Sequence, residues 1–271
     1  MHNVHNLLIN RVKNSAVSKN INSEASLVHM SELELPNIEW GNHIPRVIYQ
    51  TWESKDLPEV MQRLQQIVRD ANPTFEIKLF DTNERREFIQ KNFPAEIVYA
   101  YDTLIPGAFQ ADLWRYCMLY MYGGVYLDIS WYPEPGCSFE SFINKERYCK
   151  DWPGNFHNGR GVINGFMMVY AGNPYLKEAI RCIYKNCVAK SYHVRNPLYV
   201  TGPGVLSEIV PPNLEFTWYY SPDSIIRSIE DNRTIISSSP ECRAWMAEYY
   251  RMNLKENYTH AFHNRRVFRD L

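Results

Sequence analysis

The amino-acid sequence predicts an α/β fold, in which helices flank a Rossmann-like, mostly parallel sheet. From Val47 onward, short apolar segments alternate with segments of helical periodicity, which is the order expected of parallel strands joined by helices. The chain has 271 residues, of which 45% are hydrophobic, enough to bury a substantial core. Glycine and proline residues stand where the predicted elements end.

The first elements follow a strand–helix–strand–helix order. Residues 47–52 combine β-branched and aromatic side chains and predict a buried strand. Residues 58–72 carry apolar side chains at helical spacing, and 75–80 alternate between apolar and polar residues as a strand does. Two further helices are expected at 83–91 and 95–101.

A long helix is predicted next, at 106–122. It is stopped by Gly123 and Gly124, because glycine readily adopts the left-handed conformation that ends a helix. A strand at 125–130 is expected to follow, and the prolines after it should break it.

The rest of the chain is less regular. A strand is expected at 161–170, a helix after Pro174, and turns with short elements over 197–271. Residues 1–40 are rich in Asn and Ser and are expected to form a weakly ordered or extended leader. Residues 41–271 then form a single domain.

Composition narrows the class of protein. Lys and Arg number 29 against 30 Asp and Glu, a balance that argues against nucleic-acid binding and against a polybasic membrane patch. No segment has the ~20 apolar residues of a transmembrane helix, and residues 1–22 lack the apolar core of a signal peptide. The six cysteines follow no disulfide framework. We expect a cytoplasmic protein, or one held at a membrane face through a lipid-linked acceptor.

The helix predicted at 106–122 is apolar nearly all round, yet it contains Asp112 and Arg115 on one side. Burying charges is costly unless they are paired and hydrogen-bonded. The two residues therefore form either a structural salt bridge or one wall of a polar pocket that meets ligand hydroxyls. The second interpretation is favoured.

Asp128 follows the apolar strand that begins after Gly124. Ligands of parallel α/β sheets bind at the carboxyl ends of the strands, where this carboxylate would project. An oxygen ligand there suits Mg²⁺ or Mn²⁺ bridging a diphosphate. The alternative is an ordinary cap or turn residue.

Three segments together resemble the DXD-containing sugar-transferase region of glycosyltransferase family 32, and they read IPRVIYQTW (44–52), FQADLWRY (109–116) and YGGVYLD (122–128). That family includes fungal initiating α-1,6-mannosyltransferases and capsule-type enzymes, and its core is similar to that of the clostridial glucosylating toxins. The resemblance extends over about residues 44–205. It implies a GT-A fold, a nucleoside-diphosphate sugar donor, Mn²⁺ or Mg²⁺, a glycan or polysaccharide acceptor, and usually retention of anomeric configuration.

The resemblance also implies roles for individual residues. Asp112 and Arg115 would hydrogen-bond the donor sugar, and Asp128 would be the first acid of the DXD element, near the ribose and the metal. Trp52 would stack on the base, unless it is a core aromatic residue. The residues expected to bind the donor are Tyr49, Gln50, Trp52, Asn164, Gly165 and Thr201.

The metal-binding part departs from the family pattern. Ser130 replaces the second acid of DXD, and a neutral hydroxyl is a poorer partner for a divalent cation. The candidates for a further metal ligand near the end of the sequence are His260 and His263. The alternative is that both are surface residues. If 260–263 formed a strand, the two would lie on opposite faces and one of them would reach the metal.

The sequence therefore predicts a hexosyltransferase that uses a nucleotide sugar. A rival is a nucleotide-sugar-binding protein of the same fold without turnover, because of Ser130. A glycoside hydrolase would need two carboxylates flanking the scissile bond, and nothing in the sequence singles out such a pair.

Overall fold

A computed structural model describes residues 33–152, 161–253 and 255–271. Most of the expected leader, residues 1–32, lies outside this range. Residues 33–40 are extended, and Leu33 and Leu35 are buried in the main hydrophobic core. The hydroxyl of Tyr120 donates a hydrogen bond to the Pro36 carbonyl at 2.5 Å. Residues 33–40, called the strap below, are thus tied to the helix Gly107–Tyr122.

The elements appear in an order that alternates strands and helices in the first half of the chain. They are β1 Val47–Thr51, α3 Glu59–Ala71, β2 Glu76–Phe80, α4 Thr82–Asn92, α5 Ala95–Thr103, α6 Gly107–Tyr122, β3 Gly124–Leu127, β4 Trp131–Pro133, η2 Phe139–Phe142, β5 Cys149–Lys150, β6 Phe166–Val169, α7 Pro174–Val188, η4 Pro197–Tyr199, α8 Pro203–Ile209, β7 Trp218–Tyr220, β8 Ile225–Ser228, β9 Thr234–Ser238, α9 Pro240–Met252 and α10 Tyr258–His263.

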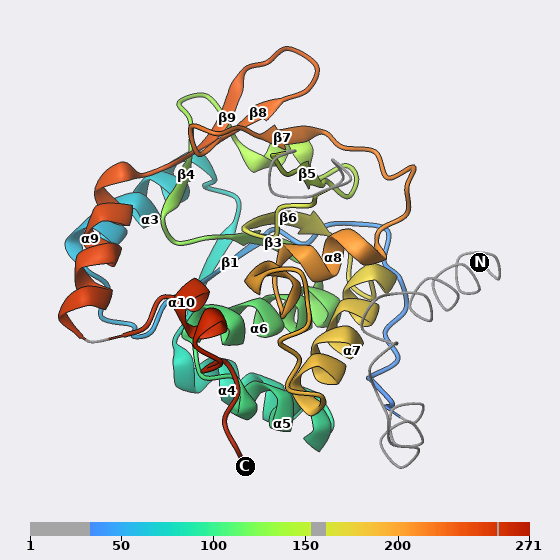
Figure 1. Cartoon of the computed structure of the whole chain (residues 1–271). Helices are drawn as coiled ribbons and strands as arrows, with labels where there is room; N and C mark the ends of the chain where they lie inside the picture. The colour runs from blue at the N-terminus through green and yellow to red at the C-terminus, as the bar shows by residue number, and fades with distance from the viewer. Residues whose placement is uncertain (1–32, 153–160, 254) are drawn as a thin grey trace.

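The central sheet has the strand order β2-β1-β3-β6, and Figure 1 shows α4, α5, α6 and α7 on one side of it. Strand β1 pairs in parallel with both β2 and β3, whereas β6 runs antiparallel to β3. The predicted α/β fold is confirmed. Strand β6 is the antiparallel exception because the chain leaves β3 at its carboxyl end and returns to the sheet from that same end.

A second sheet, of order β4-β9-β8-β7-β5, lies on the other side of the central sheet (Figure 1). It is antiparallel except for the β5–β7 pair. The sequence did not predict it, because its strands are two to five residues long and come from distant parts of the chain. The proline that was expected to break a strand, Pro133, instead ends edge strand β4, where a missing N–H is tolerated.

Three predictions need correction. The strand expected at 161–170 is shorter and is formed by Phe166–Val169. The strand expected at 125–130 ends at Leu127, and the next three residues form a turn into β4. Helix α9 lies in the part expected to contain turns and short elements. Helix α9 buries Cys242 fully, and Trp245, Met246, Tyr249 and Tyr250 follow it at helical spacing as a half-buried apolar stripe, a pattern that was not used to predict a helix.

Alternation along the central strands decides which side chains reach the helices. Tyr49 and Tyr126 belong to the core between the sheet and α4–α7, whereas Ile48, Val125 and Leu127 belong to the core facing the second sheet. The residue after Leu127 continues this alternation toward the helix side. That direction turns Asp128 toward α6.

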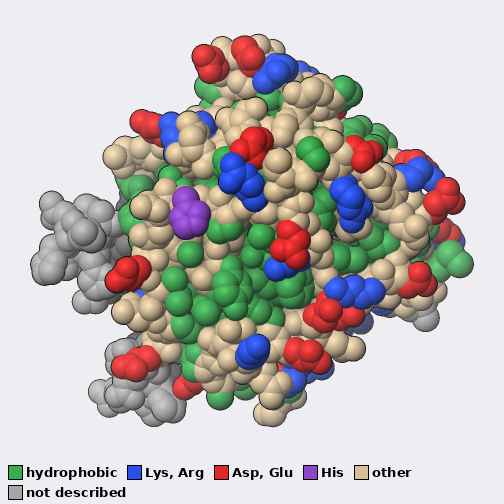
Figure 2. Space-filling view, turned by 180° about the vertical axis from the view of Figure 1, so that it is seen from behind, with side chains coloured by type: hydrophobic (Ala, Val, Ile, Leu, Met, Phe, Trp, Pro, Cys, Tyr) green, Lys and Arg blue, Asp and Glu red, His purple; other side chains and the backbone are tan. Residues whose placement is uncertain are grey.

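Figure 2 shows the face of the molecule turned away from the viewer in Figure 1, where hydrophobic side chains gather in the middle and charged ones surround them. Within the described ranges, no helix combines the length and the apolar character needed to cross a membrane.

Candidate functional site

Asp112, Arg115 and Asp128 meet at the carboxyl end of β3. Arg115 Nη2 lies 3.2 Å from Asp112 Oδ1, and Arg115 Nη1 lies 3.3 Å from Asp128 Oδ1. The side chains of Asp112 and Arg115 are 13% and 8% exposed, whereas that of Asp128 is 35% exposed. Two carboxylates thus share one buried guanidinium, and the second carboxylate opens to solvent.

Asp112 is held by side chains from three separate segments. Its Oδ1 also accepts a hydrogen bond from Asn164 Nδ2 at 2.9 Å, and its Oδ2 accepts one from Thr201 Oγ1 at 2.9 Å. Burial raises the pKa of Asp112 above the ordinary aspartate value, and Arg115, Thr201 and Asn164 offset part of that rise. The structure therefore brings together four of the residues expected to bind the donor sugar.

Arg115 is fixed from several directions. Its guanidinium lies over the Tyr126 ring at 4.3 Å, and Nη1 donates a hydrogen bond to the Asn164 carbonyl at 3.0 Å. Burial alone lowers the pKa of Arg115, but Tyr126, Asp128 and Asp112 outweigh it and raise the pKa above the ordinary arginine value. Arg115 is therefore a permanent cation in this cluster.

Asp128 presents one oxygen to the protein and leaves the other for a ligand. Its Oδ1 accepts a hydrogen bond from the Tyr126 hydroxyl at 2.7 Å, and its backbone N–H donates one to the Gly165 carbonyl at 2.9 Å. Its Oδ2 accepts no hydrogen bond from the part of the chain that the structure describes.

Two glycines allow the backbone to approach these carboxylates closely. A Cβ at Gly165 would lie 2.6 Å from Asp128 Oδ2 and 3.1 Å from Trp131 Cη2. A Cβ at Gly202 would lie 3.0 Å from Asp112 Oδ2. The predicted residue Gly165 thus borders Asp128.

Sequence reasoning missed Tyr126 and Tyr116. Tyr126 stands two residues before Asp128, on the same face of β3, and Tyr116 stands one helical turn after Asp112. Tyr116 donates a hydrogen bond to the Gly202 carbonyl at 3.1 Å and accepts one from Asn164 Nδ2 at 3.1 Å. The signal that could have found them was this spacing from the two acids.

Trp52 lies at the end of β1 and is 7% exposed. Its ring is surrounded by three rings of α9, with centroids 6.2 Å away for Trp245, 5.9 Å for Tyr249 and 6.3 Å for Tyr250. The structure therefore places Trp52 at the expected edge of the sheet, packed in an aromatic cluster.

Tyr49 and Gln50 have contacts of their own on β1, where Tyr49 is the register partner of Tyr126 on β3. The ring of Tyr49 is buried against Phe80, and burial together with Tyr122 and Glu76 raises its pKa to about 12. Gln50 is fully buried and accepts a hydrogen bond from Gln65 Nε2 at 3.3 Å, while its own Nε2 has no partner among the described residues.

His260 and His263 lie in helix α10, so the arrangement considered for a strand does not apply. Both histidines are exposed. The side chain that α10 places near the charged residues is Tyr258, which packs on Phe109. Burial raises the pKa of Tyr258, and the charge of Asp112 raises it further.

The residues fit a divalent cation held largely by a ligand's own oxygens. Nowhere in the described ranges do three His, Cys, Asp or Glu side chains gather as a metal cluster would require. Asp128 Oδ2 is the available carboxylate oxygen, and Ser130 is buried two residues further on. One carboxylate plus phosphate oxygens and water is a common set of Mg²⁺ ligands.

Comparison with known proteins supports the resemblance seen in the sequence. Residues 58–136, which carry Asp112, Arg115 and Asp128, match the family described as "Glycosyltransferase sugar-binding region containing DXD motif". Inositol phosphoceramide mannosyltransferase 3 of Schizosaccharomyces pombe is 30% identical over 61% of this chain and 44% of its own length. Inositol phosphoceramide mannosyltransferase 2 of the same organism is 31% identical over 65% of this chain and 46% of its own length.

The chain thus spans less than half the length of these curated relatives. An uncharacterized glycosyltransferase of Acanthamoeba polyphaga mimivirus is 31% identical over 32% of this chain and 35% of its own length. Among solved structures, PaToxG Glycosyltransferase aligns with 98% of this chain and 95% of its own, at a TM-score of 0.46 and 14% identity. The resemblance to DXD-containing sugar transferases is confirmed over the matched segment.

Proposed function

We propose that this chain is a glycosyltransferase that moves a hexosyl group from a nucleoside-diphosphate sugar to an acceptor hydroxyl, with retention. The observation that carries the proposal is the Asp112–Arg115–Asp128 cluster, inside the segment that matches the sugar-transferase family. The layered α/β architecture fits the GT-A fold that the resemblance implies, and retention is taken from that resemblance.

In this proposal, Asp112 and Arg115 bind hydroxyls of the donor sugar. Both side chains are buried and held in one orientation by Asn164, Thr201 and Tyr126. The Asp112 carboxylate accepts hydrogen bonds from the sugar, and the Arg115 guanidinium donates them. Because both side chains are fixed, they orient the sugar ring so that the hydroxyl of the acceptor substrate meets the anomeric carbon. Their contribution is mainly one of positioning.

Asp128 faces the leaving diphosphate in this arrangement. Its Oδ2 and Ser130 would hold Mn²⁺ or Mg²⁺, which supplies positive charge against the departing diphosphate. Tyr126 and Arg115 hold Oδ1, whereas Oδ2 lies beside Gly165 and accepts no hydrogen bond from the described residues. His260 and His263 stay predicted ligands, from exposed positions on α10.

The relatives narrow the proposed substrates. Their names specify mannosyl transfer to inositol phosphoceramide, which favours mannose as the hexose and a lipid-linked polyol among the glycan and polysaccharide acceptors. A lipid-linked acceptor would bring the protein to a membrane face, and a cytoplasmic location stays a prediction.

The test is to incubate the protein with GDP-mannose or UDP-glucose and Mn²⁺, and to measure released nucleotide. We expect release in the native protein and none in Asp128→Ala, with both proteins folded by circular dichroism. Equal release from the two proteins would remove Asp128 from the mechanism.

The second candidate, a nucleotide-sugar-binding protein without turnover, is favoured by Ser130 in place of the second acid. Under it, the same donors raise the melting temperature of the protein, because they bind the native state, while no nucleotide appears.

A further inference from the structure

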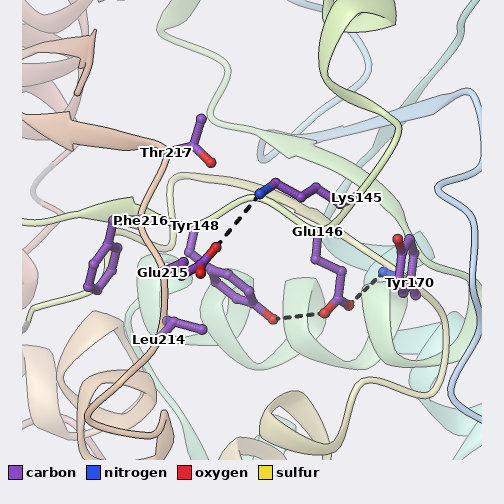
Figure 3. A pocket seen from close by; sticks show the side chains of 8 residues that line it. All are labelled: Lys145, Glu146, Tyr148, Tyr170, Leu214, Glu215, Phe216 and Thr217. Atoms are coloured by element: carbon purple, nitrogen blue, oxygen red, sulfur yellow. Dashed lines mark hydrogen bonds and ion pairs between the residues drawn. The ribbon is translucent and has the colours of Figure 1, made fainter. Parts of the chain in front are cut away.

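A pocket lies between the segment that precedes β5 and the segment that precedes β7. Its volume is about 300 Å³, and Figure 3 shows the side chains that line it. Among them are Lys145, Glu146, Tyr148, Tyr170, Glu215 and Phe216. This volume is at the lower end of ligand pockets, which suits one ring better than a chain of rings.

This pocket is separate from the Asp112–Arg115–Asp128 cluster. Strands β3 and β6 pair from Gly124↔Val169 at one end to Leu127↔Phe166 at the other. Tyr170 follows the first end and Asp128 follows the second. Five residue positions along these strands separate Tyr170 from Asp128, which is roughly 17 Å at the usual rise of a strand. A ligand of one ring cannot occupy both places.

Glu146 forms the polar end of the pocket, and its two oxygens differ. Oε1 accepts hydrogen bonds from the Tyr170 N–H at 2.9 Å, from Asn173 Nδ2 at 2.8 Å and from Trp40 Nε1 at 3.4 Å. Oε2 has the Tyr148 hydroxyl at 3.5 Å, longer than an ordinary O–H···O bond. Figure 3 shows Glu146 turned from the pocket wall toward both tyrosines. Oε1 is therefore held by three donors, whereas Oε2 accepts one long hydrogen bond, from the Tyr148 hydroxyl.

Partial burial of Glu146 disfavours the charged form of its carboxylate. Burial raises the pKa of Glu146, although Asn173 and the Tyr170 N–H lower it in part. The described residues place no cation within ion-pair distance of its carboxylate. Glu146 is half-buried, and a ligand hydroxyl at Oε2 would give this oxygen a shorter hydrogen bond than Tyr148 does.

Two of the three charged residues that line the pocket form an ion pair at its rim. At the rim, Lys145 Nζ lies 3.7 Å from Glu215 Oε2. Arg147 is occupied by the Phe142 carbonyl, Thr217 Oγ1 and Asn144 Oδ1 at 3.2, 3.2 and 2.6 Å. Arg147 is not among the lining residues, so the lining carries one cation, Lys145, and two carboxylates, Glu146 and Glu215. Lys145 and Glu215 offset each other at the rim, which leaves Glu146 to accept a hydrogen bond from a ligand.

The remaining wall is aromatic, from Tyr148, Tyr170 and Phe216. Aromatic faces combined with a few fixed polar groups are typical of small-molecule sites and provide apolar contact for the C–H face of a ring. We propose that this pocket binds a single neutral polyol ring, a hexose or a cyclitol, with Glu146 Oε2 accepting a hydrogen bond from a ring hydroxyl. The site goes beyond the proposed transfer reaction and does not require it.

The test measures binding of methyl α-D-mannopyranoside and of myo-inositol by saturation-transfer NMR. Three variants are compared with the native protein: Glu146→Gln, Asp128→Asn and, as a matched exposed control, Glu59→Gln. Glu146→Gln keeps an acceptor for the Tyr170 N–H and removes the charge, so the fold is retained. We expect at least one ring to bind, and binding to weaken about tenfold in Glu146→Gln, as for loss of one charge-assisted hydrogen bond. Asp128→Asn and Glu59→Gln should bind as the native protein does.

Each other outcome contradicts the proposal. No detectable binding of either ring at tens of millimolar overturns it, and so does equal binding by the native protein and Glu146→Gln. Loss of binding in Asp128→Asn alone would assign the signal to the donor site. Tetramethylammonium binding in place of the neutral rings would make the pocket a cation site. Nucleotide release is measured in parallel, so failure of the transfer proposal is seen separately.

Discussion

The guanidinium of Arg115 lies over the ring of Tyr126 at 4.3 Å, and the hydroxyl of that tyrosine donates a 2.7 Å hydrogen bond to Asp128. Tyr126 therefore contacts the guanidinium of Arg115 with the face of its ring and the carboxylate of Asp128 with its hydroxyl. The geometry of both charges depends on one side chain that is itself fully buried.

Tyr126→Phe keeps the ring under Arg115 and removes the hydrogen bond to Asp128. We expect a loss of about 1 kcal/mol in the free energy of unfolding, measured in urea, because one buried hydrogen bond disappears. Nucleotide release should fall as well, because Asp128 is no longer held in one orientation. Tyr132→Phe on β4, the next strand along the chain, is the control and should keep the native rate; equal rates in the two variants would contradict a positioning role for Tyr126.

Arg115→Met removes the cation between two carboxylates. Asp112 is then left buried without a counter-ion, which should cost about 3–5 kcal/mol in the free energy of unfolding. Arg251→Met removes an arginine from an exposed pair with Glu248 and should change stability little. A small effect at Arg115, measured in urea, would show that Asp112 is already protonated in the native protein.

Gly165→Ala would place a Cβ 2.6 Å from Asp128 Oδ2. The carboxylate has to move, so we expect a strong loss of nucleotide release and of the thermal shift that Mn²⁺ plus donor produces. Gly107→Ala is the matched control, because a Cβ there meets nothing within 4 Å. Native release from Gly165→Ala would mean that Oδ2 does not face the ligand.

The raised pKa of Asp112 predicts a pH dependence of both stability and function. The native state favours the protonated carboxyl, so this residue's contribution to stability is full below its unfolded pKa and decreases as pH rises through the native one. Asp112→Asn should remove that slope, which urea titrations at several pH values can measure. Sugar binding through an ionised Asp112 should likewise fail on the acid side at a pH above the ordinary aspartate pKa of 3.8.

Ser130→Asp restores the second acid of the DXD pattern. The side chain is 9% exposed, so the new charge should lower the melting temperature in the absence of metal. Mn²⁺ should then raise the melting temperature of Ser130→Asp more than that of the native protein, because a second carboxylate strengthens cation binding. Ser130→Asn separates the size of the side chain from its charge; an identical response of Asp and Asn variants would place this position outside the metal site.

Local pattern was enough to predict the elements around the cluster. The Gly123-Gly124 stop, the apolar helix before it and the short strand after it fix where Asp112, Arg115 and Asp128 stand along the chain. Parallel topology then predicts that the end of β3 faces a ligand. In the structure, two ion-pair distances show that these three residues lie together.

Contacts between segments that are far apart in the sequence could not be predicted from local patterns. Thr201 reaches Asp112 across 89 positions, and the resemblance rather than any local period brought it into the argument. The second sheet depends on pairings between strands too short to show a period, such as β4 with β9. Helix α9 is a different case, because Cys242, Trp245 and Tyr249 lie at helical spacing and this signal was present in the sequence. What the sequence did not show is that these rings pack around Trp52.

The strap ahead of β1 has a consequence for where the folded unit starts. Leu33 and Leu35 fill the same core as α6, and Tyr120 is bonded to the Pro36 carbonyl. A chain that began at residue 41, the boundary that composition suggests, would expose to water the part of this core that Leu33 and Leu35 cover. Shortened versions intended for crystallisation or assay should therefore keep every residue from Leu33 onward.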